Sequence, residues 1–280
     1  MRLACRDTLL DLSDPVVMGV LNVTPDSFSD GGRYLDPAGA VEQGLRMAEE
    51  GAGIIDVGGE STRPGAAPVD AREELRRVLP VIERLAARLP VPVSVDTSKP
   101  EVMRAAVGAG ASFINDVRAL EVPGAIEAAA ESRAAVCLMH MRGEPRTMQD
   151  APGYDDVVDE VRGYLAGRVA ACRRAGIAAQ RICIDPGIGF GKRPEHNLAL
   201  LAALDRIADP GIPVLVGVSR KSLVGIITGR PPGERLAGSV AFAALAVARG
   251  ASIIRAHDVP ATVDAVKVAV ALRSAAAGGS

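Results

Sequence analysis

The sequence predicts an α/β protein, a single (β/α)8 TIM barrel, from three observations. Eight short apolar runs are separated by mostly helical patterns, and strands that alternate with helices form a parallel sheet. Each run ends at, or within two residues of, a polar side chain. The chain has 280 residues, close to the ~250 of a typical barrel. Because barrel chemistry lies at the carboxyl ends of the strands, we expect these polar residues to ring one pocket.

The strands are predicted, in chain order, by where their apolar runs stop. The first four runs, 15–21, 54–55, 93–95 and 113–114, stop at Asn22, Asp56, Asp96 and Asn115. The other four, 136–139, 182–184, 214–218 and 253–254, stop at His140, at Asp185, at Ser219-Arg220-Lys221, and at Arg255 with His257. Successive stops lie 19 to 45 residues apart, which leaves room in every case for a crossover helix.

The segments between the strands show helical periodicity. Apolar residues at positions 75, 78, 79, 82, 85 and 86 form one stripe, which a helix can lay on a sheet. Helix starts are predicted at Asp36-Pro37, as N-cap and first helical residue, and at residues 98–101, where Ser98 and Glu101 have capping-box spacing.

We expect one domain over residues 1–280, with a barrel core of about 16–272. Residues 1–14 are interpreted as a short N-terminal extension that covers the closed end of the barrel, and the Ala/Gly/Ser tail 275–280 as disordered. The loops at 24–33 and 58–66, after strands 1 and 2, are longer and richer in glycine than a βα turn requires. Long loops at this end of a barrel usually serve a ligand.

Composition excludes several classes of protein. No apolar stretch approaches the ~18–20 residues of a membrane span, and the N-terminus lacks a signal-peptide pattern, so we expect a cytoplasmic protein. The net charge of −2, from 32 basic and 34 acidic residues, argues against general nucleic-acid binding. The four cysteines lack C-x-x-C spacing, which favours reduced core thiols over metal or redox sites.

Asp96, Asn115 and Asp185 each end a strand after apolar residues, so we expect their side chains to be partly buried. Carboxylates at strand ends can simply cap the next helix. The functional alternative is that two carboxylates and an amide converge on a flat heterocycle rich in N–H groups, because ionised carboxylates only accept hydrogen bonds.

Basic residues follow the last two predicted strands. The Ser219-Arg220-Lys221-Ser222 segment could be a solvated turn, but at the open end of a barrel it favours contact with an anion or a ring carbonyl. Arg255 and His257 are two residues apart and therefore share one strand face. With Asn22 on the neighbouring strand 1, they predict an anion site.

Two histidines, a glycine-rich segment and two loop phenylalanines also bear on function. His140 fits direct ligand contact and structural support equally well, whereas His196 is interpreted as surface at a helix start. The glycine-rich segment 185–192 lacks both the dinucleotide and the P-loop spacing. Phe28 and Phe190 lie in loops although the chain has only seven aromatic residues, which predicts that a flat aromatic substrate packs there.

Six motifs carry a resemblance to a known family: residues 19–32 (GVLNVTPDSFSDGG), 56–65 (DVGGESTRPG), 138–141 (LMHM), 185–192 (DPGIGFGK), 219–221 (SRK) and 255–259 (RAHDV). Over about residues 16–272 the chain resembles the dihydropteroate synthases of folate biosynthesis, the targets of sulfonamides. The resemblance implies that 4-aminobenzoate is joined to (7,8-dihydropterin-6-yl)methyl diphosphate, with release of pyrophosphate, to give 7,8-dihydropteroate.

The resemblance also implies a set of site residues. The pterin would be held by Asp96, Asn115, Asp185 and Lys221, and pyrophosphate by Arg255, His257, Thr62 and Arg63. The pocket for 4-aminobenzoate would be formed by Phe28, Thr62, Arg63, Pro64 and Phe190, and Ser222 would be a further substrate-binding residue. Lys221, Arg255, His257 and Asp96 would act in catalysis, and Asn22 would hold part of a Mg²⁺ site. The family further implies a homodimer formed through the outer helices.

Two alternatives stay open at the level of sequence. A pterin-binding methyltransferase would keep the carboxylates but has no use for a pyrophosphate site, so residues 62–64 and the pair Arg255 and His257 count against it. A non-catalytic pterin-binding paralogue should have shorter loops after strands 1 and 2, and here both loops have full length.

Overall fold

The computed structural model describes residues 1–24, 37–61, 68–144, 147–207 and 211–278. Within them, eight parallel strands form one sheet in the order β8-β7-β6-β5-β4-β3-β10-β9. A parallel bridge between Ile184 of β8 and Val214, just before β9, joins the two ends of the sheet. The strands are β3 (Val16–Asn22), β4 (Ile54–Gly58), β5 (Val93–Asp96), β6 (Phe113–Asp116), β7 (Ala135–Met139), β8 (Ile182–Asp185), β9 (Leu215–Val216) and β10 (Ile253–Ala256).

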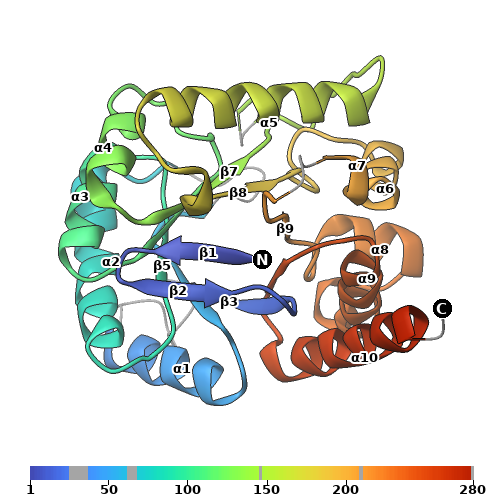
Figure 1. Cartoon of the computed structure of the whole chain (residues 1–280), viewed down its shortest axis with the longest axis horizontal. Coiled ribbons are helices and arrows are strands. Elements are labelled where there is room, and N and C mark those ends of the chain that lie inside the picture. Colours follow the sequence, from blue (N-terminus) through green and yellow to red (C-terminus); the bar gives the residue numbers. More distant parts are fainter. Residues whose placement is uncertain (25–36, 62–67, 145–146, 208–210, 279–280) are drawn as a thin grey trace.

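Helices surround this barrel, as Figure 1 shows, and the (β/α)8 prediction is confirmed. They are α1 (Pro37–Glu49), α2 (Ala71–Ala86), α3 (Pro100–Gly108), α4 (Ala125–Ser132), α5 (Val157–Arg174), α6 (Pro194–Ala202), α7 (Leu204–Ile207), α8 (Ser222–Thr228), α9 (Leu236–Ala248) and α10 (Val259–Gly278), with short 3-10 turns η1 (Ala179–Arg181) and η2 (Pro232–Glu234). Parallel strands covered by helices are buried on both faces, which explains their continuous apolar runs.

Local sequence explains most helix starts. The side chain of Asp70 caps α2 by accepting a hydrogen bond from the Glu73 N–H, and Asp156 caps α5 in the same way. The predicted apolar stripe of α2 is buried against the sheet through Val78, Ile82 and Leu85. Helix α1 begins at Pro37 as predicted, while Asp36 lies outside the described residues.

The capping box predicted at Ser98 is wrong. Helix α3 begins at Pro100 behind Lys99, and no side chain caps it. Ser98 instead hydrogen-bonds to the carboxylate of Asp116 at the end of β6. Asp116 is fully buried, so its need for a donor outweighs the small gain from a helix cap.

The N-terminal extension closes the amino end of the barrel, as predicted. Strands β1 (Arg2–Cys5) and β2 (Thr8–Asp11) form an antiparallel hairpin, which lies across the ring of strands in Figure 1. Its buried side chains Leu3 and Cys5 pack on inward-facing strand residues such as Met18 and Phe113. The other end of the barrel is therefore the end available for ligands.

Two further boundaries concern the tail and the seventh strand. Helix α10 ends at Gly278 and residues 279–280 lie outside the described residues, so the disorder expected for the tail 275–280 stays a prediction. The seventh strand is short, because only Leu215–Val216 is paired as a strand. All four cysteines are free and buried, as predicted, and among the described residues no helix has the length and apolarity to cross a membrane.

Candidate active site

The polar residues predicted to form a ring do lie at the carboxyl ends of the barrel strands. Asn22, Asp96 and Asp185 are the last residues of β3, β5 and β8, and Asn115 and Arg255 lie one residue before the ends of β6 and β10. Asp96, Asn115 and Asp185 are all buried. Buried polar side chains at this end need partners, and their partners define the site.

Arg255 is the centre of a charged cluster that spans several strands. Its Nε donates to Oδ2 of Asp56 at 2.7 Å, and its Nη2 donates to Oδ2 of Asp96 at 2.9 Å. The Asn115 amide donates to the same Asp56 oxygen at 3.0 Å. Burial opposes the charge of Arg255, but Asp56 and Asp96 outweigh it and raise the pKa of the guanidinium.

Asp96 has an unusual proton affinity for a carboxyl group. Burial raises its pKa to about 7, although Arg255 acts in the opposite direction. Burial thus favours the protonated form of Asp96 more than in an ordinary carboxyl group, so the side chain can either accept or donate a hydrogen bond. Such a shift in a cleft, caused by burial next to a specific charge, is typical of functional sites.

Asp56 belongs to the predicted ring of strand-end residues, but the sequence assigned it no role in binding or catalysis. It is fully buried in β4, and among the described residues its Oδ1 has no hydrogen-bond partner. Its position was recognised as a strand end, but its neighbours across the barrel could not be known from sequence. The signal that could have found it is an aspartate directly after the two isoleucines of a buried strand.

Lys221 lies on the opposite part of the ring, after β9. Its Nζ donates to the carbonyl of Ile188 at 2.6 Å and lies 4.6 Å from the ring centroid of Phe190, within cation–π range. Burial lowers the pKa of Lys221 to about 8, and Asp185 opposes the shift. The structure thus brings together three residues predicted for the substrates, Lys221, Asp185 and Phe190.

Two glycines keep the space between these groups open. A Cβ placed on Gly217 would lie 3.7 Å from both Lys221 Nζ and Arg255 Cβ. A Cβ on Gly58 would lie 3.7 Å from Oδ1 of Asn22 and 3.8 Å from Oδ2 of Asp96. Side chains at positions 58 and 217 would therefore contact these polar groups from two different strands.

The predicted pairing of Arg255 with His257 is only partly seen. Arg255 faces the two carboxylates, whereas Nδ1 of His257 lies 3.0 Å from the hydroxyl of Ser219, and the His257 N–H donates to that hydroxyl at 3.2 Å. Ser222 is exposed at the first position of α8. Arg220 turns outward and pairs with Asp258, with its Nε 2.9 Å from Oδ2.

The two histidines left over have structural contacts. His140 is buried with its Nδ1 2.9 Å from Nζ of Lys192, and burial lowers its pKa to about 3, so the ring is neutral. The sequence suggested that His196 is a surface residue, and this prediction is wrong. His196 is 7% exposed, because its ring accepts a hydrogen bond from the Arg193 N–H at 3.2 Å and packs edge-on against Tyr154.

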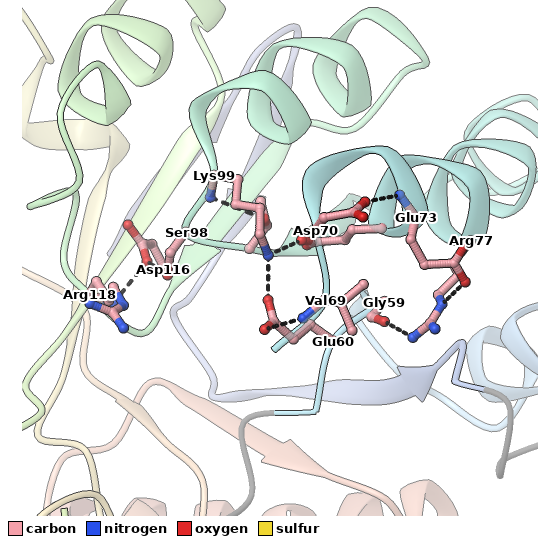
Figure 2. A network of polar contacts seen from close by, with 12 residues as sticks. Gly59, Glu60, Val69, Asp70, Glu73, Arg77, Ser98, Lys99, Asp116 and Arg118 are labelled. Carbon is pink, nitrogen blue, oxygen red and sulfur yellow. Dashed lines mark hydrogen bonds and ion pairs between the residues drawn. The ribbon is translucent and has the colours of Figure 1, made fainter. Parts of the chain in front are cut away.

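Four predicted site residues, Phe28, Thr62, Arg63 and Pro64, lie outside the described residues. The chain on both sides of residues 62–67 is held by an ion-pair network (Figure 2). Lys99 pairs with Glu60 and with the fully buried Glu74, and Glu60 Oε1 accepts from the Val69 N–H at 3.1 Å. Arg77 donates to the carbonyl of Gly59 at 2.8 Å.

Lys99 and Lys192 are site-forming residues that the sequence analysis missed. Of the 32 basic residues, 28 are arginine and only four are lysine: positions 99, 192, 221 and 267. Three of these lysines lie in segments that follow barrel strands, and Lys267 is exposed on α10. Lys99 and Lys192 each use a compact ammonium group that several acceptors can surround, which the planar guanidinium of arginine would not fit.

Comparison with known proteins identifies the family. A family profile described as "Pterin binding enzyme" matches residues 18–257. The chain belongs to the pterin-binding enzyme family. Within this family it is 55% identical, over 275 residues and 98% of both chains, to the dihydropteroate synthase of Escherichia coli strain K12.

Solved structures agree with this assignment of the pterin-binding enzyme. The dihydropteroate synthase of Xanthomonas albilineans with 4-aminobenzoic acid is 57% identical and has a TM-score of 0.91, covering 97% of this chain and 98% of that one. The same enzyme in complex with 7,8-dihydropteroate is 54% identical, with a TM-score of 0.89 over 98% and 99% of the two chains. The resemblance read from the six motifs is confirmed.

Proposed function

We propose that this protein is a dihydropteroate synthase, a transferase that joins 4-aminobenzoate to (7,8-dihydropterin-6-yl)methyl diphosphate and releases pyrophosphate. The observation that carries the proposal is its 55% identity, over 98% of both chains, to a curated enzyme of that activity. The site supports it independently, because buried carboxyl groups and cationic groups lie near one another at the carboxyl end of the barrel. Such a set suits a flat ring rich in both donors and acceptors.

The pterin would lie between Asp96, Asn115, Asp185 and Lys221. The carboxyl groups of Asp96 and Asp185 would accept from its N–H edge, and Lys221 would donate to its ring acceptors. Arg255, fixed by Asp56 and Asp96, lies beside this volume and presents its cationic face to the ring and to the diphosphate. Pre-organised charges of this kind are worth most in a water-excluded site.

The reaction we favour begins with cleavage of the bond between the pterin methylene carbon and the diphosphate oxygen. The electron pair leaves with pyrophosphate, and the carbocation is delocalised into the dihydropterin, where Asp96 and Asp185 stabilise the positive charge. The amine nitrogen of 4-aminobenzoate then attacks the carbon and loses a proton to solvent. The amine is unprotonated at pH 7, so no strong base is required, and holding the two reactants together supplies up to ~7–11 kcal/mol.

A Mg²⁺ ion fits the residues at the end of β3. Asn22 Oδ1 and Asp96 Oδ2 both face the space over Gly58, and amide and carboxylate oxygens are hard ligands suited to this ion. The described residues contain no cluster of three metal-binding side chains, as suits an ion that keeps several waters and binds largely through substrate phosphates. When bound, Mg²⁺ would neutralise charge on the leaving diphosphate.

The 4-aminobenzoate site would form beside Phe190, whose ring lies against Lys221, and would be completed by Phe28, Thr62, Arg63, Pro64 and Ser222. Because these residues come from several separate segments, we propose that the amine substrate binds after the pterin and pyrophosphate, with His257 among the groups that hold pyrophosphate. Calorimetric titration of 4-aminobenzoate with and without pterin, pyrophosphate and Mg²⁺ tests this order. Equal affinity in both titrations would contradict it.

We also propose that the enzyme is a cytoplasmic homodimer that pairs through α8, α9 and α10. These outer helices expose large apolar side chains: Ile226 and Leu245 are each 62% exposed, and Leu272 is 71% exposed. Exposed apolar side chains that gather on one part of a surface favour a protein interface. Light scattering, which measures the mass of the particle in solution, tests this face. Leu245→Glu should yield monomers, whereas the control Leu198→Glu, on α6, should leave the dimer intact.

The activity itself is tested with purified protein, both substrates and Mg²⁺. Stoichiometric release of pyrophosphate and 7,8-dihydropteroate is expected. A pterin-binding methyltransferase would release no pyrophosphate, and a non-catalytic paralogue would bind the pterin without turnover. Either outcome would overturn the proposed activity.

A further inference from the structure

Lys192 is a buried lysine at the carboxyl end of the barrel with no role in the reaction proposed above. Burial lowers its pKa to about 7, although Asp185 acts in the opposite direction. Lys192 is 2% exposed. Its Nζ donates to the carbonyls of Gly187 and Phe190, both at 3.0 Å, and to the carbonyl of His140 at 3.2 Å. Its fourth neighbour is Nδ1 of His140 at 2.9 Å, so the three N–H groups of the ammonium are shared among four polar atoms.

These contacts make Lys192 a cross-link between two chain segments. Two of the four polar atoms come from the turn after β8, residues 187–191, and two come from the residue after β7. Burying an ammonium is costly unless its N–H groups are hydrogen-bonded, so the three carbonyl acceptors must stay in place for the charge to be tolerated. An arginine would bring five donors in a rigid plane, which four polar atoms converging on one point cannot satisfy.

Tight packing restricts the backbone conformation of the turn at residues 187–191, which Lys192 holds. Gly187 and Gly191 both have positive φ angles, +69° and +62°. A Cβ at Gly187 would lie 1.9 Å from the His140 carbonyl oxygen, and one at Gly191 would lie 2.2 Å from that of Arg142. The backbone of the turn therefore rests directly on the segment after β7, where Lys192 joins them.

The opposite side of the same turn faces the substrate pocket. The carbonyl of Ile188 accepts from Lys221 at 2.6 Å, and Phe190 lies under the same ammonium. At the start of the turn, Asp185 Oδ1 accepts from the Gly187 N–H at 2.7 Å. A change in the turn would thus move Lys221, Asp185 and Phe190 together.

We propose that Lys192 is a positioning residue for pterin binding: by holding the turn at residues 187–191 it sets the places of Lys221 and Asp185. The inference rests on the proposed function for the identity of the ligand. Lys192 also acts through charge, since burial raises the pKa of Asp185 while the Lys192 ammonium is among the groups that lower it. Without that ammonium, Asp185 would take up its proton at higher pH.

The test uses Lys192→Met, which keeps side-chain length and removes the charge and all donors, with Lys267→Met as the matched control on exposed α10. For Lys192→Met we expect a dissociation constant for 6-hydroxymethylpterin that is at least tenfold larger. We also expect the acid limb of the pH profile of kcat/KM to move to higher pH. Lys192→Arg should not restore either property, and Lys267→Met should match the parent protein.

Because the chain has only four lysines, NMR can measure directly whether a change at Lys192 alters the surroundings of Lys221. Protein labelled with [ε-¹³C]lysine should give four resonances, assigned by substitution. In Lys192→Met the Lys221 resonance should shift, while those of Lys99 and Lys267 stay in place. Lys192→Gln, which keeps two donors, serves if the Met variant does not fold.

A variant with a lowered melting temperature but unchanged pterin affinity, pH profile and Lys221 resonance would show that Lys192 only stabilises the fold, and the inference would be wrong. Failure of the proposed function is distinguishable: the parent protein would then bind no pterin, yet the Lys221 resonance would still respond to substitution at position 192.

Discussion

Replacing Arg255 with methionine should expose the energetic cost of the charged cluster at the centre of the site. Methionine keeps much of the side-chain volume but leaves Asp56 and Asp96, which are 0% and 9% exposed, without their shared cation. Removing one partner of a buried ion pair costs about 3–5 kcal/mol. At ~2 °C per kcal/mol for a large domain, the melting temperature at pH 8.5 should fall by about 6–10 °C.

The loss should depend on pH with a definite sign. Burial already raises the pKa of Asp96 to about 7 from an ordinary value of 3.8, and loss of Arg255 removes the group that opposes this shift. The folded variant then binds more protons than its unfolded chain across a window reaching above pH 7, so its stability falls as pH rises through that window. At pH 5.5 Asp96 is protonated in both proteins, and the difference should shrink to about half.

Thermal unfolding followed by circular dichroism at 222 nm measures this effect, since the chain has no tryptophan. The matched control is Arg88→Met, which breaks an exposed ion pair with Glu42 and should cost at most about 1 kcal/mol at either pH. A loss for Arg255→Met that is no larger than the control, or that is the same at pH 5.5 and 8.5, would refute the account of the cluster.

Three further predictions concern single residues. Asp96→Asn should gain stability relative to the parent as pH rises from about 4 to 7. Over this range the unfolded parent releases the Asp96 proton while the folded parent, with a pKa of about 7, keeps it, so the parent loses stability and the Asn variant does not. Denaturant titrations at pH 5 and 8 measure the change, and a constant difference would contradict it. Gly187→Ala should cost about 2–5 kcal/mol, from left-handed strain of about 1–2 kcal/mol and overpacking against His140 of about 1–3 kcal/mol, whereas Gly108→Ala, with nothing within 4 Å, should be neutral or stabilising; equal melting temperatures for the two variants would argue against the packing described. Asn22→Ala should require several-fold more Mg²⁺ for half-maximal pyrophosphate release because one oxygen ligand is lost, and full activity in excess EDTA would exclude the metal from the proposal.

The fold and the ring of strand-end residues could be predicted because both leave local patterns. Apolar runs, helical periodicity and the polar residue that stops each run are visible within ten residues of one another, and barrel geometry then requires all the stops to lie at one end. The wrong prediction at Ser98 also has a physical cause. Ser98 was assigned to a helix cap from its spacing alone, although the buried carboxylate of Asp116, 18 residues away, binds it instead.

The sequence by itself determined which polar residues lie at the carboxyl ends of the strands, since the side-chain period of a strand and the direction of parallel strands leave little choice. Tertiary structure alone decided how those residues pair. Arg255 lies 199 residues from Asp56 in the chain, and Lys192 lies 52 residues from His140. Such contacts depend on barrel closure and side-chain reach, and no local pattern records which buried charge will meet which partner across the ring.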